Sequence, residues 1–272
     1  NKIRLPVNKE NVIKSGLVKP KDYDLIVPFI DIDLPEGGMT KNQIVMLDIL
    51  ANNDWERPIY FTGGSYADSE YIWMKEYLQL EGLVYKLVPI RTPMNSNNPY
   101  IMGRLDSDSM YDIVMQWSWG NSESPSIYHD PETRKNSISF RSNMARLAEK
   151  LIDEGKNKKA KEVLDLAVQK MPLDYFGYYS LVVPMIDTYY RLGDIKSAQD
   201  LAAQIAEKYR DEMEYFSSLK ASEQYFLGEE IITQAERYRT LMEAILVNKD
   251  KIQLNKSLIQ LLEAIKPFIN LY

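Results

Sequence analysis

Two pairs of aspartates carry the residue types and spacing that could do chemistry in this sequence. Asp31 and Asp33 stand two positions apart in a segment rich in β-branched residues. Asp106 and Asp108 repeat that spacing further along the chain. Alternate side chains of a strand face the same way, so such a pair can hold a divalent cation beside a sugar or phosphate substrate. In a chain with 39 acidic residues the pattern also arises by chance, and we favour a solvated strand or a helix cap for both pairs.

The sequence contains one histidine, His129, and no cysteine. Any Ser–His–Asp or Cys–His arrangement would have to pass through that residue. Its neighbour Asp130 is poorly placed to orient the ring, because it is adjacent in sequence. A zinc site would lack both sulfur ligands and a second histidine. We therefore predict no catalytic residue, no metal site and no cofactor in this chain, and we interpret His129 as a polar loop residue.

Composition and charge exclude two classes of partner. The chain of 272 residues has a net charge of −6. This charge argues against nucleic acid as a partner, since proteins bind nucleic acids mainly through Lys and Arg side chains that neutralise phosphates. No apolar run approaches the roughly 18 residues needed to cross a bilayer, so we expect no direct membrane insertion. The sequence opens on Asn1 rather than methionine, which indicates a fragment or a processed chain.

The elements that must position these residues form a mixed first part and a helical second part. We predict a small α/β domain over residues 1–130 and an all-α domain over residues 137–272, giving an α+β protein overall. The polar stretch over residues 121–136, with two prolines, separates them because it can bury little apolar surface.

The first domain alternates extended and helical patterns. Thr40 and Gln43 have the spacing of a capping box at the start of one helix. A strand, a helix and a strand in succession predict a βαβ unit. We expect strands over residues 2–7, 25–34, 57–62 and 83–90, and helices over residues 8–15, 41–52, 69–80 and 109–117, the last capped by Asp108.

The second domain repeats one helical-hairpin pattern. Ala160 and Ala198 stand 38 positions apart, and so do Gly155 and Gly193. Small residues where two helices cross and a glycine at the turn are typical of tetratricopeptide-like hairpins. Two hairpins alone expose an apolar end, so the last helices should cap the stack. We expect hairpins over residues 141–210, and further helices over residues 211–219, 222–247 and 250–269.

Helical hairpins of this kind present surfaces for other molecules rather than perform chemistry. Their concave face can hold an extended peptide, although packing of the helices on the first domain would cover it. The four tryptophans all fall in the first domain, where they could stack on sugar rings, but we favour core packing for them. Trp119, beside Gly120 and Asn121, is the one that we expect to be most exposed. The candidate groove residues are Asn143, Arg146, Lys150, Tyr178, Asp187 and Tyr190.

Several stretches of the sequence resemble a known family. They are residues 51–61, which include Trp55-Glu56-Arg57-Pro58, and residues 77–89, 103–106, 111–112, 119–121, 128–130 and 140–148. Together they resemble the extracytoplasmic C-terminal region of a family of large bacterial polytopic membrane proteins of unknown function. That family is grouped with glycosyltransferases that are similar to protein O-mannosyltransferases.

The resemblance implies that the chemistry and the accessory role lie in different parts of the full-length protein. The predicted chemistry of such a parent lies in an N-terminal membrane domain that is absent from this sequence, and no functional residue of the family can be carried across. What remains is an accessory region that is periplasmic or otherwise extracytoplasmic, tethered to the membrane in the full-length protein, with its own membrane domain as one partner.

These observations predict a soluble accessory or interaction region that binds protein, peptide or glycan and is not itself an enzyme. Whether the parent is an active glycosyltransferase stays open. One alternative is a stand-alone metal-dependent enzyme that acts on a sugar or phosphate through Asp31 and Asp33. Another is a free tetratricopeptide scaffold protein without an enzymatic parent.

Overall fold

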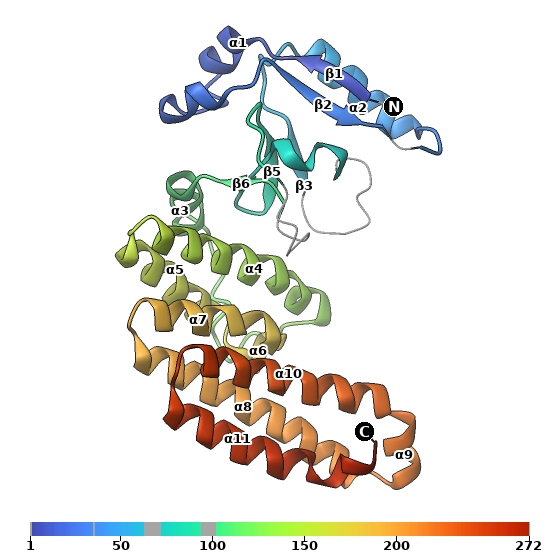
Figure 1. Cartoon of the computed structure of the whole chain (residues 1–272), viewed down its shortest axis with the longest axis vertical. Coiled ribbons are helices and arrows are strands. Elements are labelled where there is room, and N and C mark those ends of the chain that lie inside the picture. The colour runs from blue at the N-terminus through green and yellow to red at the C-terminus, as the bar shows by residue number, and fades with distance from the viewer. Residues whose placement is uncertain (1, 35, 63–71, 94–101, 272) are drawn as a thin grey trace. The chain divides into compact units, whose positions relative to one another are not determined.

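The computed structural model describes residues 2–34, 36–62, 72–93 and 102–271. The chain forms two compact units, Asn1–Gln116 and Trp117–Tyr272, each with its own core (Figure 1). The division falls before the polar stretch over residues 121–136 that we expected to separate the domains. The reason is that Trp117 and Trp119 pack on Phe140, with ring centroids 4.9 and 5.5 Å away, which ties residues 117–130 to the helical unit.

The first unit begins with a two-stranded antiparallel sheet. Strand β1 (Lys2–Pro6) pairs with β2 (Phe29–Asp33), and Ile3 lies opposite Ile32. Between the strands come helix α1 (Lys9–Lys14) and a 3-10 helix, η1 (Pro20–Leu25). Ile30 and Ile32 are buried, so one face of β2 belongs to the core and the other face carries its acidic residues.

A second sheet has four strands in the order β3-β5-β4-β6. They are β3 (Tyr60–Thr62), β4 (Leu78–Glu81), β5 (Val84–Leu87) and β6 (Arg104–Leu105). Strand β5 is antiparallel to both of its neighbours, and β6 is parallel to β4.

The predicted βαβ unit is wrong. Residues 78–81, which we expected to end a helix over residues 69–80, form β4, and Ile72–Tyr77 is a 3-10 helix, η2. Gly82 has φ +66° and turns β4 directly into β5, the geometry of a tight hairpin rather than of a helix end. Residues 63–71 of the expected segment lie outside the described residues.

Two longer helices complete the first unit. Helix α2 (Lys41–Asn52) begins with the predicted capping box: the Thr40 hydroxyl accepts from the Gln43 amide at 3.3 Å, and the Thr40 amide donates to the Gln43 side chain at 2.9 Å. Helix α3 (Ser107–Met115) is capped by Asp106 rather than by Asp108. The core includes Met74, Leu78, Leu80, Met110 and Val114.

The second unit begins with a loop over residues 117–130, and from Pro131 on it is built of helices joined by short turns (Figure 1). Helices α4 and α5 pack as one hairpin, α7 and α8 pack as a second, and α10 and α11 pack against α8. The elements are α4 (Pro131–Asp153), α5 (Asn157–Lys170), α6 (Leu173–Phe176), η3 (Tyr179–Val182), α7 (Val183–Arg191), α8 (Ile195–Ser218), α9 (Ala221–Phe226), α10 (Gly228–Val247), α11 (Lys251–Ile265) and η4 (Lys266–Leu271).

The repeat positions take the places that the pattern predicts. Ala160 and Ala198 are fully buried in the second helix of their hairpins. Gly155 and Gly193 have φ of +72° and +76°, a left-handed conformation that costs glycine little, and each lies between the helices of its hairpin.

The last helices differ from the prediction in their boundaries. Residues 211–218 continue α8 because Tyr209 and Met213 extend its buried stripe and no glycine or proline interrupts it. The segment over residues 222–247 is split between α9 and α10 at Gly228. Among the described residues, no helix has the length and apolar composition needed to cross a membrane.

Candidate functional site

The first pair of aspartates is neutralised by the neighbouring strand. The register of β1 and β2 places Arg4 opposite Asp31 and Lys2 opposite Asp33. Arg4 donates from Nε and Nη2 to the two oxygens of Asp31 at 2.8 and 3.2 Å, and this hydrogen bonding holds the pKa of Asp31 below its usual value. Lys2 Nζ lies 3.3 Å from Asp33. These are cross-strand ion pairs on a solvated face, which is the interpretation that we favoured.

The described residues contain no group of three or more His, Asp or Glu side chains arranged to hold a metal ion. Asp31 and Asp33 therefore have no third protein ligand there.

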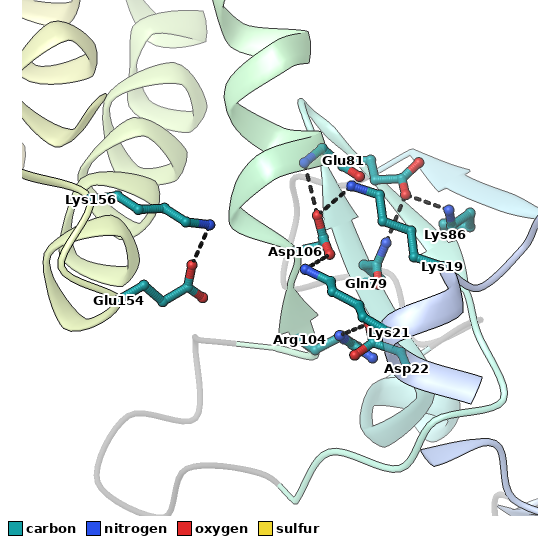
Figure 2. Close-up of polar contacts among 11 residues, drawn as sticks. Lys19, Lys21, Asp22, Gln79, Glu81, Lys86, Arg104, Asp106, Glu154 and Lys156 are labelled. Carbon is teal, nitrogen blue, oxygen red and sulfur yellow. Dashed lines mark hydrogen bonds and ion pairs between the residues drawn. The ribbon is translucent and has the colours of Figure 1, made fainter. Parts of the chain in front are cut away.

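Of the second pair, Asp106 belongs to a charged cluster of the first unit (Figure 2), whereas Asp108 lies in the first turn of α3. Asp106 is almost fully buried and caps α3 by accepting from the Ser109 amide at 2.8 Å. Its carboxylate also lies 2.9 Å from Lys19 Nζ and 2.7 Å from Lys21 Nζ. Burial opposes its ionisation, but the hydrogen bonds from Lys21, Ser109 and Lys19 outweigh burial and hold the pKa of Asp106 well below its usual value.

Two further ion pairs extend this cluster over the sheet. Glu81 on β4 lies 2.5 Å from Lys86 on β5 and accepts from Gln79 at 2.8 Å. Arg104 on β6 pairs with Asp22 of η1 at 2.6 Å. We define the charged cluster as Lys19, Lys21, Asp22, Gln79, Glu81, Lys86, Arg104 and Asp106 (Figure 2).

In the charged cluster each of the four cations faces a carboxylate at 2.9 Å or less. A cavity of about 340 Å³ adjoins it, lined in part by Lys19, Gln79 and Lys86. The cluster has four cations and only three carboxylates, because Lys19 and Lys21 share Asp106, so ion pairs neutralise most but not all of its charge. Its contacts join η1 to β6 and to the start of α3, and join β4 to β5, so its clearest role is to hold this unit together.

The candidate groove residues of α4 lie on the helix surface. Asn143 and Arg146 are half-buried, and Lys150 is exposed with an ion pair to Glu154 at 3.5 Å.

The candidate residues of α7 are engaged by the end of α10 and the start of α11. The Tyr190 hydroxyl donates to Asp250 at 3.1 Å, and the ring is buried. Asp187 accepts from the Asn248 amide at 2.9 Å. Tyr178 lies elsewhere, in the turn between α6 and η3, with φ +48°. The hydroxyl of Tyr190 and the carboxylate of Asp187 are thus already engaged by other parts of the second unit.

Trp119 instead marks a pocket in the second unit, although we expected it in the first domain. The pocket has a volume of about 390 Å³, and we call it the Trp119 pocket. It is lined by Ser118, Trp119, Gly120, Ser122, Ile127, Tyr128, His129, Thr133, Asn136, Ser137, Phe140, Met171 and Phe176. None of these residues is Lys, Arg, Asp or Glu.

Local structure holds the loop that forms one side of this pocket. Gly120 and Asn121 both have positive φ, 57° and 62°, a conformation that glycine and asparagine tolerate best. The Ser122 hydroxyl then donates to the carbonyl of Lys170 at 2.6 Å, which fastens the loop to the end of α5.

His129 forms part of the pocket wall. It is nine-tenths buried, its ring packs on Phe176 with centroids 4.5 Å apart, and Nε2 lies 2.9 Å from the Ser122 carbonyl oxygen. Asp130 does not orient the ring: its carboxylate accepts from the amides of Glu132 and Thr133 and so caps α4. The residue is more buried than the polar loop position that the sequence indicated.

The opposite wall depends on Arg141, a buried cation of α4. Its guanidinium donates to the carbonyls of Met171 and Gly177, which end α5 and α6, and lies over the Phe176 ring. Burial lowers the pKa of Arg141 to about 10. Carbonyls at helix C-termini favour a cation, so Arg141 fixes the segment that brings Met171 and Phe176 to the pocket.

Sequence reasoning found Trp119 but missed the rest of this pocket. Phe140, Met171 and Phe176 come from three segments whose proximity no local pattern encodes. The signal that was present is the pair of left-handed residues at 120 and 121 directly after an aromatic residue.

Comparison with known proteins gives one match. Residues 1–109 match the family model of TMEM260-associated domain 2, a domain of a membrane-protein-associated family. The matched residues include the charged cluster and end before the Trp119 pocket. No curated protein and no solved structure matches the chain. The match agrees with the link to a membrane-protein family, whereas the grouping with glycosyltransferases and the tetratricopeptide assignment stay predictions.

Proposed function

We propose that this chain is a ligand-binding, non-catalytic accessory region of a membrane-tethered, glycosyltransferase-like protein, on the extracytoplasmic side. The observation that carries the proposal is the Trp119 pocket. It is preformed, and its volume lies within the roughly 300–1,000 Å³ of small-molecule sites. Aromatic rings and side-chain hydroxyl or amide groups line it, which is chemistry suited to recognition.

The proposal that this chain does not catalyse a reaction is supported by the ion pairs and hydrogen bonds that its candidate catalytic groups already make. Asp31 and Asp33 form ion pairs with β1, and Asp106 caps a helix between two lysines. Among the residues that line the Trp119 pocket, His129 has no acidic neighbour that could orient it for base catalysis. A binding role requires none of these groups to react.

The accessory role is supported by the match of residues 1–109 to a TMEM260-associated domain. A surface-presenting function also suits stacked helical hairpins. The partner is a protein, a peptide or a glycan, and in the full-length protein also its own membrane domain.

The test combines binding and turnover on the purified chain. We expect one class among neutral glycans and short peptides to bind, and Tyr128→Ala at the pocket to weaken that binding. With Mg²⁺ or Mn²⁺ and sugar-nucleotide, polyprenyl-phosphate-sugar or phosphoester substrates, we expect no product.

The double variant Asp31→Ala/Asp33→Ala serves as the control for turnover. Product formation that disappears in this variant would overturn the proposal in favour of a metal-dependent enzyme. Binding that survives every change at the pocket would place recognition on another surface of a scaffold protein.

A further inference from the structure

We propose that the Trp119 pocket binds one uncharged sugar residue of a glycan. This inference rests on the binding role proposed above and names the ligand of the same site. Three properties of the pocket carry it: the charge of its lining, the polar groups left without partners, and the shape of its aromatic walls.

The lining favours an uncharged ligand. It contains no Lys, Arg, Asp or Glu side chain. Two charged groups close to the lining along the chain already have partners, since Glu123 pairs with Lys170 and Asp130 caps α4, whereas the buried Nε of Arg134 has none among the described residues. A phosphate, a carboxylate or a charged peptide side chain would lose its hydration in this pocket without gaining an opposite charge.

Two nearly buried polar groups of the pocket lack a partner among the described residues. Nε1 of Trp119 is buried and donates to no acceptor there. On His129, Nε2 donates to the Ser122 carbonyl because a carbonyl oxygen can only accept, and Nδ1 makes no hydrogen bond among the described residues. The lining thus holds an unused indole N–H and an unused imidazole nitrogen, and a sugar hydroxyl can pair with either because it both donates and accepts.

The exposed side of the pocket adds a free carboxamide. Asn136 lines the pocket on the first turns of α4, and its side chain makes no hydrogen bond within the described part of the chain. A carboxamide can donate to one hydroxyl and accept from its neighbour. Adjacent hydroxyls on a pyranose ring offer that pairing.

The aromatic side chains suit the flat apolar faces of a sugar ring. Trp119 packs edge-on against Trp117 and lies against Phe140, so its orientation is fixed before a ligand arrives. Tyr128 is 83% exposed at the mouth of the pocket, where its ring can cover the C–H face of a bound pyranose. Fixed rings lose little conformational entropy on binding.

A peptide fits the same pocket less well. The pocket is built from helices and a loop, so it offers no strand edge on which a peptide backbone could pair. At about 390 Å³ it is also too short for the row of anchors by which a helix binds a groove.

The experiment titrates methyl glycosides of neutral hexoses and N-acetylhexosamines into the chain, followed by saturation-transfer NMR and calorimetry. We expect at least one to bind with an affinity on the order of millimolar. Tyr128→Ala and Asn136→Ala should each weaken it about tenfold, and Trp119→Phe, which keeps a ring but removes the N–H, about fivefold.

Tyr225→Ala is the matched control, because Tyr225 is also 83% exposed and does not line the pocket. It should leave the affinity unchanged. Circular dichroism of each variant confirms that a loss of binding is not a loss of fold.

Each outcome separates this inference from the proposed function. If peptides bind, lose affinity in Tyr128→Ala and are not displaced by any glycoside, the binding role stands and the sugar assignment is wrong. A glycopeptide that binds no better than its sugar-free peptide would contradict the sugar assignment as well. If neither glycosides nor peptides bind, both proposals fail.

Discussion

At the scale of single residues, Asp106 and Asp31 show how two similar sequence patterns reach different environments. Asp31 is opposite an arginine on a solvated strand, where an ion pair contributes little to stability. Asp106 is nearly buried, and two lysines together with a backbone amide hold it ionised. The pattern D-x-D therefore marks a surface pair in one place and a structural anchor in the other.

We expect Asp106→Asn to destabilise the chain at pH 7 and to do so much less near pH 2. The folded-state pKa of Asp106 lies below its unfolded value of about 4. The carboxylate therefore contributes stability that is present above that unfolded value and is lost as the pH falls toward the folded pKa. Urea unfolding at both pH values measures the difference, with Asp33→Asn as an exposed control. An equal loss at pH 7 and pH 2 would contradict this assignment.

At the scale of elements, the helical hairpins depend on small residues where helices cross. Ala160 on α5 and Ala198 on α8 are fully buried, with no room for a larger side chain without displacement of a neighbouring helix. Their positions follow from the 38-residue repeat, so the hairpins are the part of the fold in which sequence and structure agree most closely.

Ala160→Leu and Ala198→Leu should each destabilise the helical unit by about 1–3 kcal/mol, because the larger side chain overpacks the crossing. Thermal unfolding followed by circular dichroism measures the loss. Ala221→Leu, at an exposed position of α9, is the control and should change stability little. Unchanged melting temperatures in both buried variants would show that the helix register is different.

At the scale of the whole molecule, the chain is two units with separate cores. The second contains the Trp119 pocket in full, together with its own apolar clusters, one of which comprises Met213, Ile231, Ala264 and Phe268. The first contains the charged cluster and all of the residues that match the TMEM260-associated domain.

A chain of residues 117–272 alone should fold and keep the sugar affinity of the full chain. The physical reason is that every residue lining the pocket, and the buried Arg141 that holds one of its walls, lies within this range. Circular dichroism and the same glycoside titration provide the measurement. A helical but non-binding product would show that the first unit completes the site.

Local sequence determined what depends on neighbours along the chain. The capping box at Thr40 formed because its two hydrogen bonds join residues three positions apart. The helical hairpins could be predicted because their glycines and alanines recur 38 positions apart. The lack of cysteine and the single histidine restricted, from the sequence alone, the nucleophile–base pairs that the chain could form.

Tertiary structure decided what depends on pairing between distant segments. Residues 78–81 became a strand, because β5 and β6 offered hydrogen-bonding partners on both sides. We expected Tyr190 to line a groove, but its ring is buried and its hydroxyl donates to Asp250, 60 positions further along the chain. The Trp119 pocket arose only when Arg141 held the segment from Met171 to Gly177 beside α4. Such contacts depend on the three-dimensional path of the chain, and no local spacing records them.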